Sequence, residues 1–265
     1  MTEPSGSSAP RDLEQRVLDT WDFADPTGTA ERFRLAADAA TTLGESAVLR
    51  TQQARATGLA GDFEAASRIL EEVKLPGPDG DPHARARLAI ERGRVLNSTG
   101  DPAGAAPYFS SAHELALEAW APGLAVDALH MQAIAAGATD GPIAARAIDE
   151  LALAEIEASD DPAVRRWLGS ILNNLGWDLH DAGRPEEALT VFERAVEVRH
   201  EAGQAAETLI ARWCVGRTLR TLGRYDEALV LMRELESDPV GAEDQYVHEE
   251  IAANLEALGR PAPAG

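Results

Sequence analysis

Two stretches of this 265-residue chain align with each other without a gap. They are Asn174–Leu189 and Cys214–Leu229, which lie 40 residues apart. Both have glycine at their third and tenth positions, leucine at the sixth and alanine at the fifteenth. The same pattern fits three earlier segments more loosely, at successive offsets of 39, 39, 44 and 40 residues. Such a period predicts an array of short units that complete one another's core.

Each element of the pattern has a physical role in a pair of helices. A small residue in the first helix lets the second approach, and a turn glycine accepts positive φ where the first helix ends. A bulky residue one turn after a small one then fills the space between the helices. The pattern positions are, in chain order, Ala54, Gly93, Gln132, Gly176 and Gly216 in the first helices, Gly61, Gly100, Thr139, Gly183 and Gly223 in the turns, Ala66, Ala105, Ala144, Ala188 and Ala228 in the second helices, and Leu70, Phe109, Ile148, Phe192 and Met232 one turn later.

This pattern resembles the tetratricopeptide repeat, a helix pair of about 34 residues with a Leu-Gly pair and small alanine positions. Leu175, Gly176, Ala188, Phe192 and Ala195 match it best, and the longer period is similar to that of some bacterial members. The resemblance implies an all-α, right-handed superhelical solenoid of antiparallel helix pairs. The expected parts are a disordered tail (1–10), a degenerate helix pair (11–44), repeats (45–80, 81–121, 122–160, 161–202 and 203–240), a capping helix (246–258) with Glu250 and Asn254 on its polar outer side, and a tail (259–265).

Charge and composition exclude several classes of protein. The formal net charge is −21, so nucleic acid and anionic membranes would be repelled over most of the surface. One cysteine gives no disulfide framework and no multi-cysteine metal site. We find no signal sequence and no stretch long and apolar enough for a membrane helix, and we expect a cytoplasmic protein. Arginine supplies 23 of the 24 basic residues, a bias that suggests a bacterial source.

In tetratricopeptide arrays the first helices line a concave groove, and the resemblance assigns six stripe positions per repeat to it. Over five repeats these 30 positions carry a charge of +3, although the chain carries −21. The stripe includes Val48, Gln52, Arg55 and Arg87. The candidate partner-binding residues on it are Glu91, Arg94, Asn97, His130, Asn173, Asn174, Trp177, His180, Trp213, Arg217 and Arg220.

This set of residues favours recognition of a peptide, a partner segment or a small anionic ligand. Asparagine can donate to and accept from a peptide backbone, and arginine binds carboxylate or phosphate through two donors. Each residue type has a structural alternative: the stripe tryptophans could be core, and the arginines could pair with acids outside the stripe. For Trp21, Trp120 and Trp167, which are off the stripe, we expect the core.

An enzyme using the same groove is the alternative function. His130 and His180 are too far apart along neighbouring helices to share one metal ion, and no catalytic motif is present, so we predict no metal and no cofactor. Cys214 could be a nucleophile, but a lone cysteine is more often a buried apolar residue. A small-molecule site around Asn173, Trp177, His180 and Arg217 stays the second hypothesis. The oligomeric state is left open.

Overall fold

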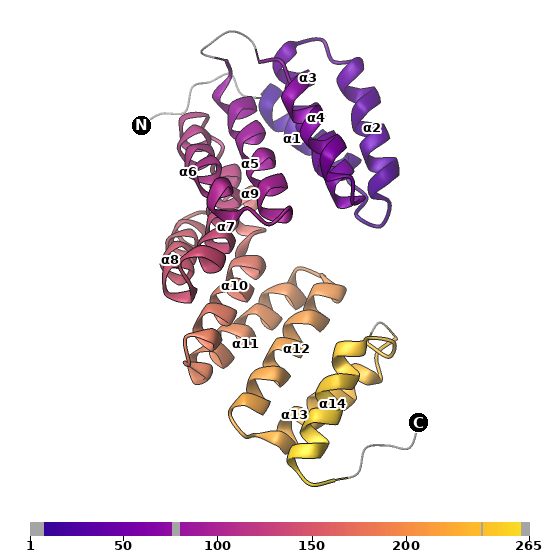
Figure 1. Ribbon diagram of the computed structural model, residues 1–265, viewed down its shortest axis with the longest axis vertical. Helices are drawn as coiled ribbons and strands as arrows, with labels where there is room; N and C mark the ends of the chain where they lie inside the picture. The colour runs from indigo at the N-terminus through magenta and orange to yellow at the C-terminus, as the bar shows by residue number, and fades with distance from the viewer. Residues whose placement is uncertain (1–7, 76–79, 240, 261–265) are drawn as a thin grey trace. The chain divides into compact units, whose positions relative to one another are not determined.

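The computed structural model describes residues 8–75, 80–239 and 241–260, and within them the chain is helical without a strand (Figure 1). The helices are α1 (Ser8–Thr20), α2 (Pro26–Asp38), α3 (Leu43–Leu59), α4 (Phe63–Glu72), α5 (Pro82–Ser98), α6 (Pro102–Glu118), α7 (Pro122–Thr139), α8 (Pro142–Glu157), α9 (Pro162–Arg165), α10 (Leu168–Asp181), α11 (Pro185–Glu201), α12 (Ala205–Thr221), α13 (Tyr225–Glu236) and α14 (Gln245–Ala257). The all-α prediction is confirmed.

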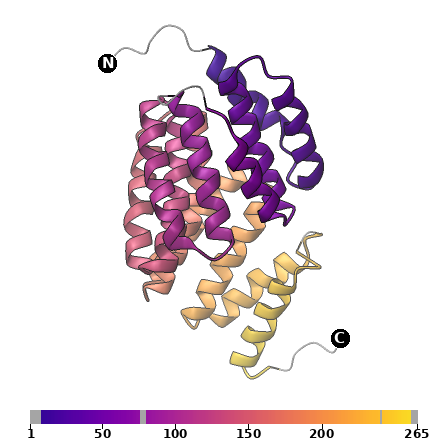
Figure 2. The ribbon, with the colours of Figure 1, turned by 45° about the horizontal axis from the view of Figure 1, so that its top comes forward.

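The chain divides into two compact units, Met1–Ala135 and Ala136–Gly265. In the N-terminal unit α3 packs on α4 and α5, and α5 packs on α6. In the C-terminal unit α10 packs on α8 and α11, α12 on α11 and α13, and α14 on α12 and α13. Helices that follow one another along the chain turn back on one another (Figure 2). Each unit is thus a stack of helix pairs, in which α3 and α5, or α10, α12 and α14, are the first helices.

The small and bulky pattern positions meet as the sequence predicts. A Cβ atom at Gly93 would overlap the ring of Phe109, and one at Gly176 would overlap the ring of Phe192. Both phenylalanines are fully buried. Gly100, in the turn between these helices of the N-terminal unit, has φ +91°, which an L side chain rarely adopts. The repeat pattern therefore records the contact between the two helices of each pair.

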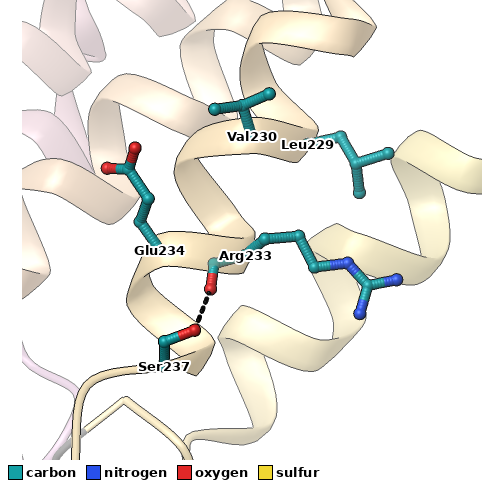
Figure 3. A pocket seen from close by; sticks show the side chains of 5 residues that line it. All are labelled: Leu229, Val230, Arg233, Glu234 and Ser237. Atoms are coloured by element: carbon teal, nitrogen blue, oxygen red, sulfur yellow. Dashed lines mark hydrogen bonds between the residues drawn. The ribbon is translucent and has the colours of Figure 1, made fainter.

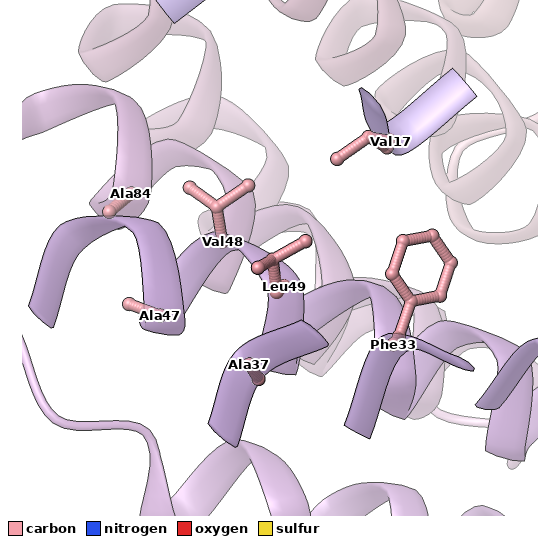
Figure 4. Close-up of a cluster of buried hydrophobic side chains, with 7 residues drawn as sticks. All are labelled: Val17, Phe33, Ala37, Ala47, Val48, Leu49 and Ala84. Carbon is pink, nitrogen blue, oxygen red and sulfur yellow. The ribbon is translucent and has the colours of Figure 1, made fainter. Parts of the chain in front are cut away.

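The first core cluster ties together helices that are distant in sequence (Figure 4). Val17 of α1 and Phe33 of α2 share it with Val48 of α3 and Ala84 of α5. Val48 is a predicted groove position, yet it is 0% exposed. Part of the predicted groove stripe is therefore core.

The third repeat departs from the prediction by one residue. Ala145 and Asp149 of α8 are buried, whereas Ala144 and Ile148, which the pattern assigned to the core, are half-buried. The helix begins at Pro142, so Asp149 is the eighth residue of α8, as Phe109 is of α6. The shift places a carboxyl group where the other repeats have a bulky apolar side chain. It does not come from the turn before α8, which has two residues against three between α5 and α6.

Both predicted tails fall partly outside the described residues, which exclude 1–7 and 261–265. Residues 8–10 of the first predicted tail belong to α1. Among the described helices, none is long and apolar enough to cross a membrane.

Candidate functional site

Aromatic side chains from the three first helices of the C-terminal unit form a row. The ring centroids of Trp177 (α10) and Trp213 (α12) are 6.1 Å apart, and those of Trp213 and Tyr246 (α14) are 6.2 Å apart. Trp177 also meets the buried Phe192 edge to face. Both tryptophans are partly buried, and Tyr246 is 56% exposed. The tryptophans thus combine the two roles considered for them: one side packs on the core and the other reaches the surface.

Polar groups flank this aromatic row. Trp213 Nε1 donates to the backbone oxygen of Tyr246 at 3.1 Å, which holds the indole in place. His180 Nε2 lies 2.9 Å from the Thr221 hydroxyl, and this contact bridges α10 and α12. Within the part of the chain that the structure describes, Asn174 Nδ2 has no hydrogen-bond partner. The Nδ2 atom is buried, so this donor is not accessible to a ligand at the surface.

Two arginines of α12 share one carboxylate of α14. Arg220 binds Glu250 through two bonds, Nε to Oε2 at 2.6 Å and Nη2 to Oε1 at 3.1 Å. Arg217 Nε lies 3.3 Å from Oε1 of the same residue. The side chain of Glu250 is 8% exposed, whereas those of Arg217 and Arg220 are 31% and 27% exposed. The three side chains together carry a net charge of +1, and the two arginines are partly exposed to solvent.

The sequence missed Glu250 as a member of this site. We expected Glu250 and Asn254 on the polar outer side of the capping helix, and both are buried. The prediction was wrong because α14 packs on both α12 and α13, so a wider arc of its surface is covered than one apolar stripe. Two arginines one turn apart on α12 were the available signal for an acid on the next helix.

Cys214 is a buried thiol. It is 1% exposed and donates to Asn173 Oδ1 at 3.6 Å. Burial raises the pKa of the Cys214 thiol to about 12, so the thiolate is not populated at neutral pH. His180, the nearest predicted base, is held by Thr221 and by Asp181. This geometry gives a nucleophile no activation.

The candidate residues of the N-terminal unit form a separate, closed cluster. Arg94 of α5 pairs with Asp127 of α7 at 2.5 Å and with Glu91 of its own helix at 3.3 Å. Its Nη1 also lies 3.1 Å from the sulfur of Met131. Burial, together with the charge of Arg94, lowers the pKa of His130 to about 4 despite Asp127 nearby. Arg94 is thus occupied by acids, and His130 is neutral at physiological pH.

The remaining predictions are placed as follows. Asn97 is half-buried near the end of α5. The expectation of a core position is wrong for Trp120, which is 60% exposed with φ 53° in the turn after α6. Trp21 and Trp167 are half-buried.

A depression on α13 lies apart from all predicted site residues (Figure 3). It is lined by Leu229, Val230, Arg233, Glu234 and Ser237. These residues come from α13 and the position directly after it, and Ser237 Oγ donates to the Arg233 backbone oxygen at 2.9 Å. The depression is a surface feature of one helix and gathers no reactive groups.

Helix pairs joined by glycine turns and packed through a small residue against a bulky one define the tetratricopeptide-repeat-like solenoids. Residues 167–236 match the family model of the tetratricopeptide repeat. The chain has a tetratricopeptide-repeat-like fold, and the predicted fold class is confirmed.

Solved structures extend this fold likeness to nearly the whole chain. A Rap protein complexed with Competence and Sporulation Factor aligns with a TM-score of 0.64 and 16% identity, covering 98% of this chain and 76% of that one. BtubC (BKLC) from P. vanneervenii gives 0.62 and 16%, covering 96% and 94%. Aspartyl phosphate phosphatase F from Bacillus subtilis gives 0.62 and 16%, covering 97% and 71%. A search of curated protein sequences finds no match.

Proposed function

We propose that this protein is an interaction module that binds an extended peptide segment of a partner across α10, α12 and α14. The observation that carries the proposal is the row of Trp177, Trp213 and Tyr246, one aromatic side chain from each first helix. Partly exposed aromatic rings supply large contact areas at small entropic cost, which is why they dominate protein interfaces. The expected setting is the cytoplasm of a bacterial cell.

The electrostatics of the site favour a carboxylate on the peptide. Arg217 and Arg220 share Glu250, and both guanidinium groups reach solvent. Arg217 contacts Glu250 through Nε at 3.3 Å, and its side chain is 31% exposed. A partner carboxylate beside Arg217 would complete a charge-balanced group of four.

Fold likeness supports a peptide rather than a metabolite as the ligand. The Rap protein that aligns over 98% of this chain was solved in complex with Competence and Sporulation Factor. The Cys214 pKa near 12 and the His180 hydrogen bond to Thr221 weigh against catalysis at the same place.

The test is selection of a displayed random 12-residue peptide library on the purified chain, followed by calorimetric titration of the enriched peptides. We expect these peptides to contain Asp or Glu, and Arg217→Ala to weaken their binding about 10- to 100-fold, the worth of a charged hydrogen bond. Arg220 still holds Glu250 in this variant, so the fold should persist.

Arg212→Ala is the matched control. Arg212 lies on the same helix, is 32% exposed and pairs with Glu234 of α13 at 2.6 Å, whereas Arg217 pairs with Glu250 of α14. Equal losses of affinity in the two variants, or enriched peptides without acidic residues, would contradict the proposal.

A further inference from the structure

Helix α1 contacts a helix that is not its neighbour along the repeat array. In helical arrays each repeat contacts only its neighbours. Glu14 of α1 nevertheless pairs with His83 and Arg87 of α5, which lie beyond the whole α3–α4 pair in the chain. At its other side α1 pairs with α3, where Arg16 meets Glu45 at 2.6 Å. Since α3 packs on α5, α1 lies across the face that these two first helices form together.

Helix α1 contacts this face through one charged and one apolar side chain. Glu14 Oε1 lies 2.7 Å from His83 Nε2 and accepts from Arg87 Nε at 3.2 Å, while Oε2 pairs with Arg87 Nη2. Arg87 and His83 are 7% and 9% exposed. One turn further on, Val17 enters the apolar cluster that contains Val48 and Ala84 (Figure 4). A carboxylate and an apolar side chain on one side of α1 are thus both held.

Trp21, directly after α1, completes the coverage. Its indole Nε1 donates to Gln52 Oε1 at 3.0 Å, and the Arg55 guanidinium lies 5.3 Å from the ring centroid. Gln52, Arg55 and Arg87 are all groove-stripe positions in the sequence pattern. The segment 14–21 therefore occupies the surface on which a repeat array would bind a partner.

Charge shows what Glu14 contributes. Arg55, Arg87 and Arg94 lie along this face, whereas α5 and α7 supply two acids, Glu91 and Asp127. Glu14 supplies the third carboxylate. Burial alone would raise the pKa of Glu14, but the charge of Arg87 and the hydrogen bonds from His83 and Arg87 lower it to about 2. Without α1 the face has one unbalanced positive charge.

We propose that the α3–α5 face is a second binding site, specific for an acidic amphipathic helix of a partner protein, and that α1 occupies it in cis. The partner helix would carry a carboxylate in place of Glu14, an apolar residue three positions later and an aromatic residue four positions after that. This site is in the other unit from the α10–α12–α14 site and does not depend on it.

The test measures whether a separate peptide with the sequence of α1 binds to the protein. The probe is a fluorescein-labelled synthetic peptide of residues 8–24, and the target is the full chain with Glu14→Lys and Val17→Asp, which expel α1 from the face. The control chain carries Leu18→Asp and Asp19→Lys, the same chemical changes at exposed positions of α1. We expect the peptide to bind the expelled variant at least tenfold more tightly than wild type or control, because only there is the face free.

A second peptide with Glu14→Gln should bind the expelled variant at least tenfold more weakly than the unchanged peptide, since Arg87 and His83 then lose their carboxylate. Hydrogen exchange of the expelled variant distinguishes docking from folding. Loss of protection confined to α1 and its contacts, or wider loss that the peptide restores, supports the proposal. Wider loss that the peptide does not restore would overturn it, as would equal binding to wild type and the expelled variant.

Discussion

The first-helix faces of the two units use the same residue types in opposite ways. In the N-terminal unit Arg94 lies between Glu91 and Asp127 and is buried with them. In the C-terminal unit Arg217 and Arg220 surround one acid and stay accessible to water. The difference follows from what packs on each face: Asp127 of α7 and Glu14 of α1 pair with arginines of the first, whereas the aromatic row lies on the second. The same stripe positions therefore belong to the core where other helices pack on them, and to the surface where they stay accessible to water.

The largest expected effect comes from breaking the buried cluster of the N-terminal unit. Asp127→Ala leaves Arg94 enclosed with one acid at 3.3 Å, and removal of one partner from a buried ion pair costs about 3–5 kcal/mol of unfolding free energy. Urea-induced unfolding followed by circular dichroism measures this loss.

The same truncation in the C-terminal unit is its control. Glu250→Ala leaves Arg217 and Arg220 next to solvent, so water replaces the lost carboxylate and the cost falls to about 1 kcal/mol or less. If Asp127→Ala were no more costly than Glu250→Ala, the contrast between a buried and an accessible face would be wrong.

A second contrast concerns the position between paired helices, where Phe109 and Phe192 lie in their repeats and Asp149 lies in the third. Asp149 is 0% exposed. The ionisable group that acts on it is Asp178 of α10, and Asp181 and Arg146 in turn act on Asp178. Burial, and then the adjacent Asp178 carboxylate, raise the pKa of Asp149. Burial also raises the pKa of Asp178, helped by Asp181 and opposed by Arg146. The pair therefore favours a state that retains a proton.

This pair predicts that stability decreases as pH rises. A carboxyl whose folded pKa is raised stabilises the fold fully below its unfolded value, near 4, and the contribution is lost as pH approaches the folded value. Between the unfolded value near 4 and the folded value of about 9, one retained proton changes the unfolding free energy by up to about 1.4 kcal/mol per pH unit, so from pH 5 to pH 8 we expect it to fall by up to about 4 kcal/mol. Thermal unfolding across this range, in buffers of matched ionic strength, measures the slope.

Asp149→Asn removes the titrating group and should flatten that slope, because an amide keeps the shape without the charge. Asp160→Asn, at a fully exposed position, should leave it as in wild type. A wild-type slope in Asp149→Asn would assign the pH dependence to other groups. Glu14 does not interfere, because its pKa of about 2 lies below the range.

The sequence predicts the parts of this fold that depend on local spacing. Gly93 with Phe109 and Gly176 with Phe192 are contacts within one helix pair, so the repeat pattern reveals them directly. The shift at Asp149 was missed because the third repeat has Gln132 and Thr139 at the first-helix and turn positions, and so lacks the glycines that fix the register in the second, fourth and fifth repeats.

For sites that several helices build together, the sequence predicts only some of the contacts. The stripe brought Trp177 and Trp213 together correctly on neighbouring first helices. It did not indicate which acids of other helices Arg94 and Arg220 bind, because Asp127 and Glu250 lie off the stripe and reach it only through packing between repeats. The position of α1 across α5 is a long-range contact that no local pattern encodes.

The smallest expected effect concerns how the two units begin their second helices. Asp62 and Asp101 are N-caps of α4 and α6, and each carboxylate accepts a backbone N–H at 2.8 Å. Arg184 and Arg224 hold the same place before α11 and α13 and make no capping bond. Arg184 instead pairs with Glu187 at 2.5 Å on the surface.

Because a capping side chain satisfies an otherwise unpaired helix N–H, Asp101→Ala should lower the unfolding free energy by about 1 kcal/mol. Arg184→Ala should change it by a fraction of that, since only a solvated ion pair is lost and the helix end was already open to water. Paired thermal unfolding scans of the two variants measure the difference. Equal losses would mean that the Arg184 and Glu187 pair replaces the cap in function, and the N-terminal ends of the two units' second helices would then be equivalent despite their different chemistry.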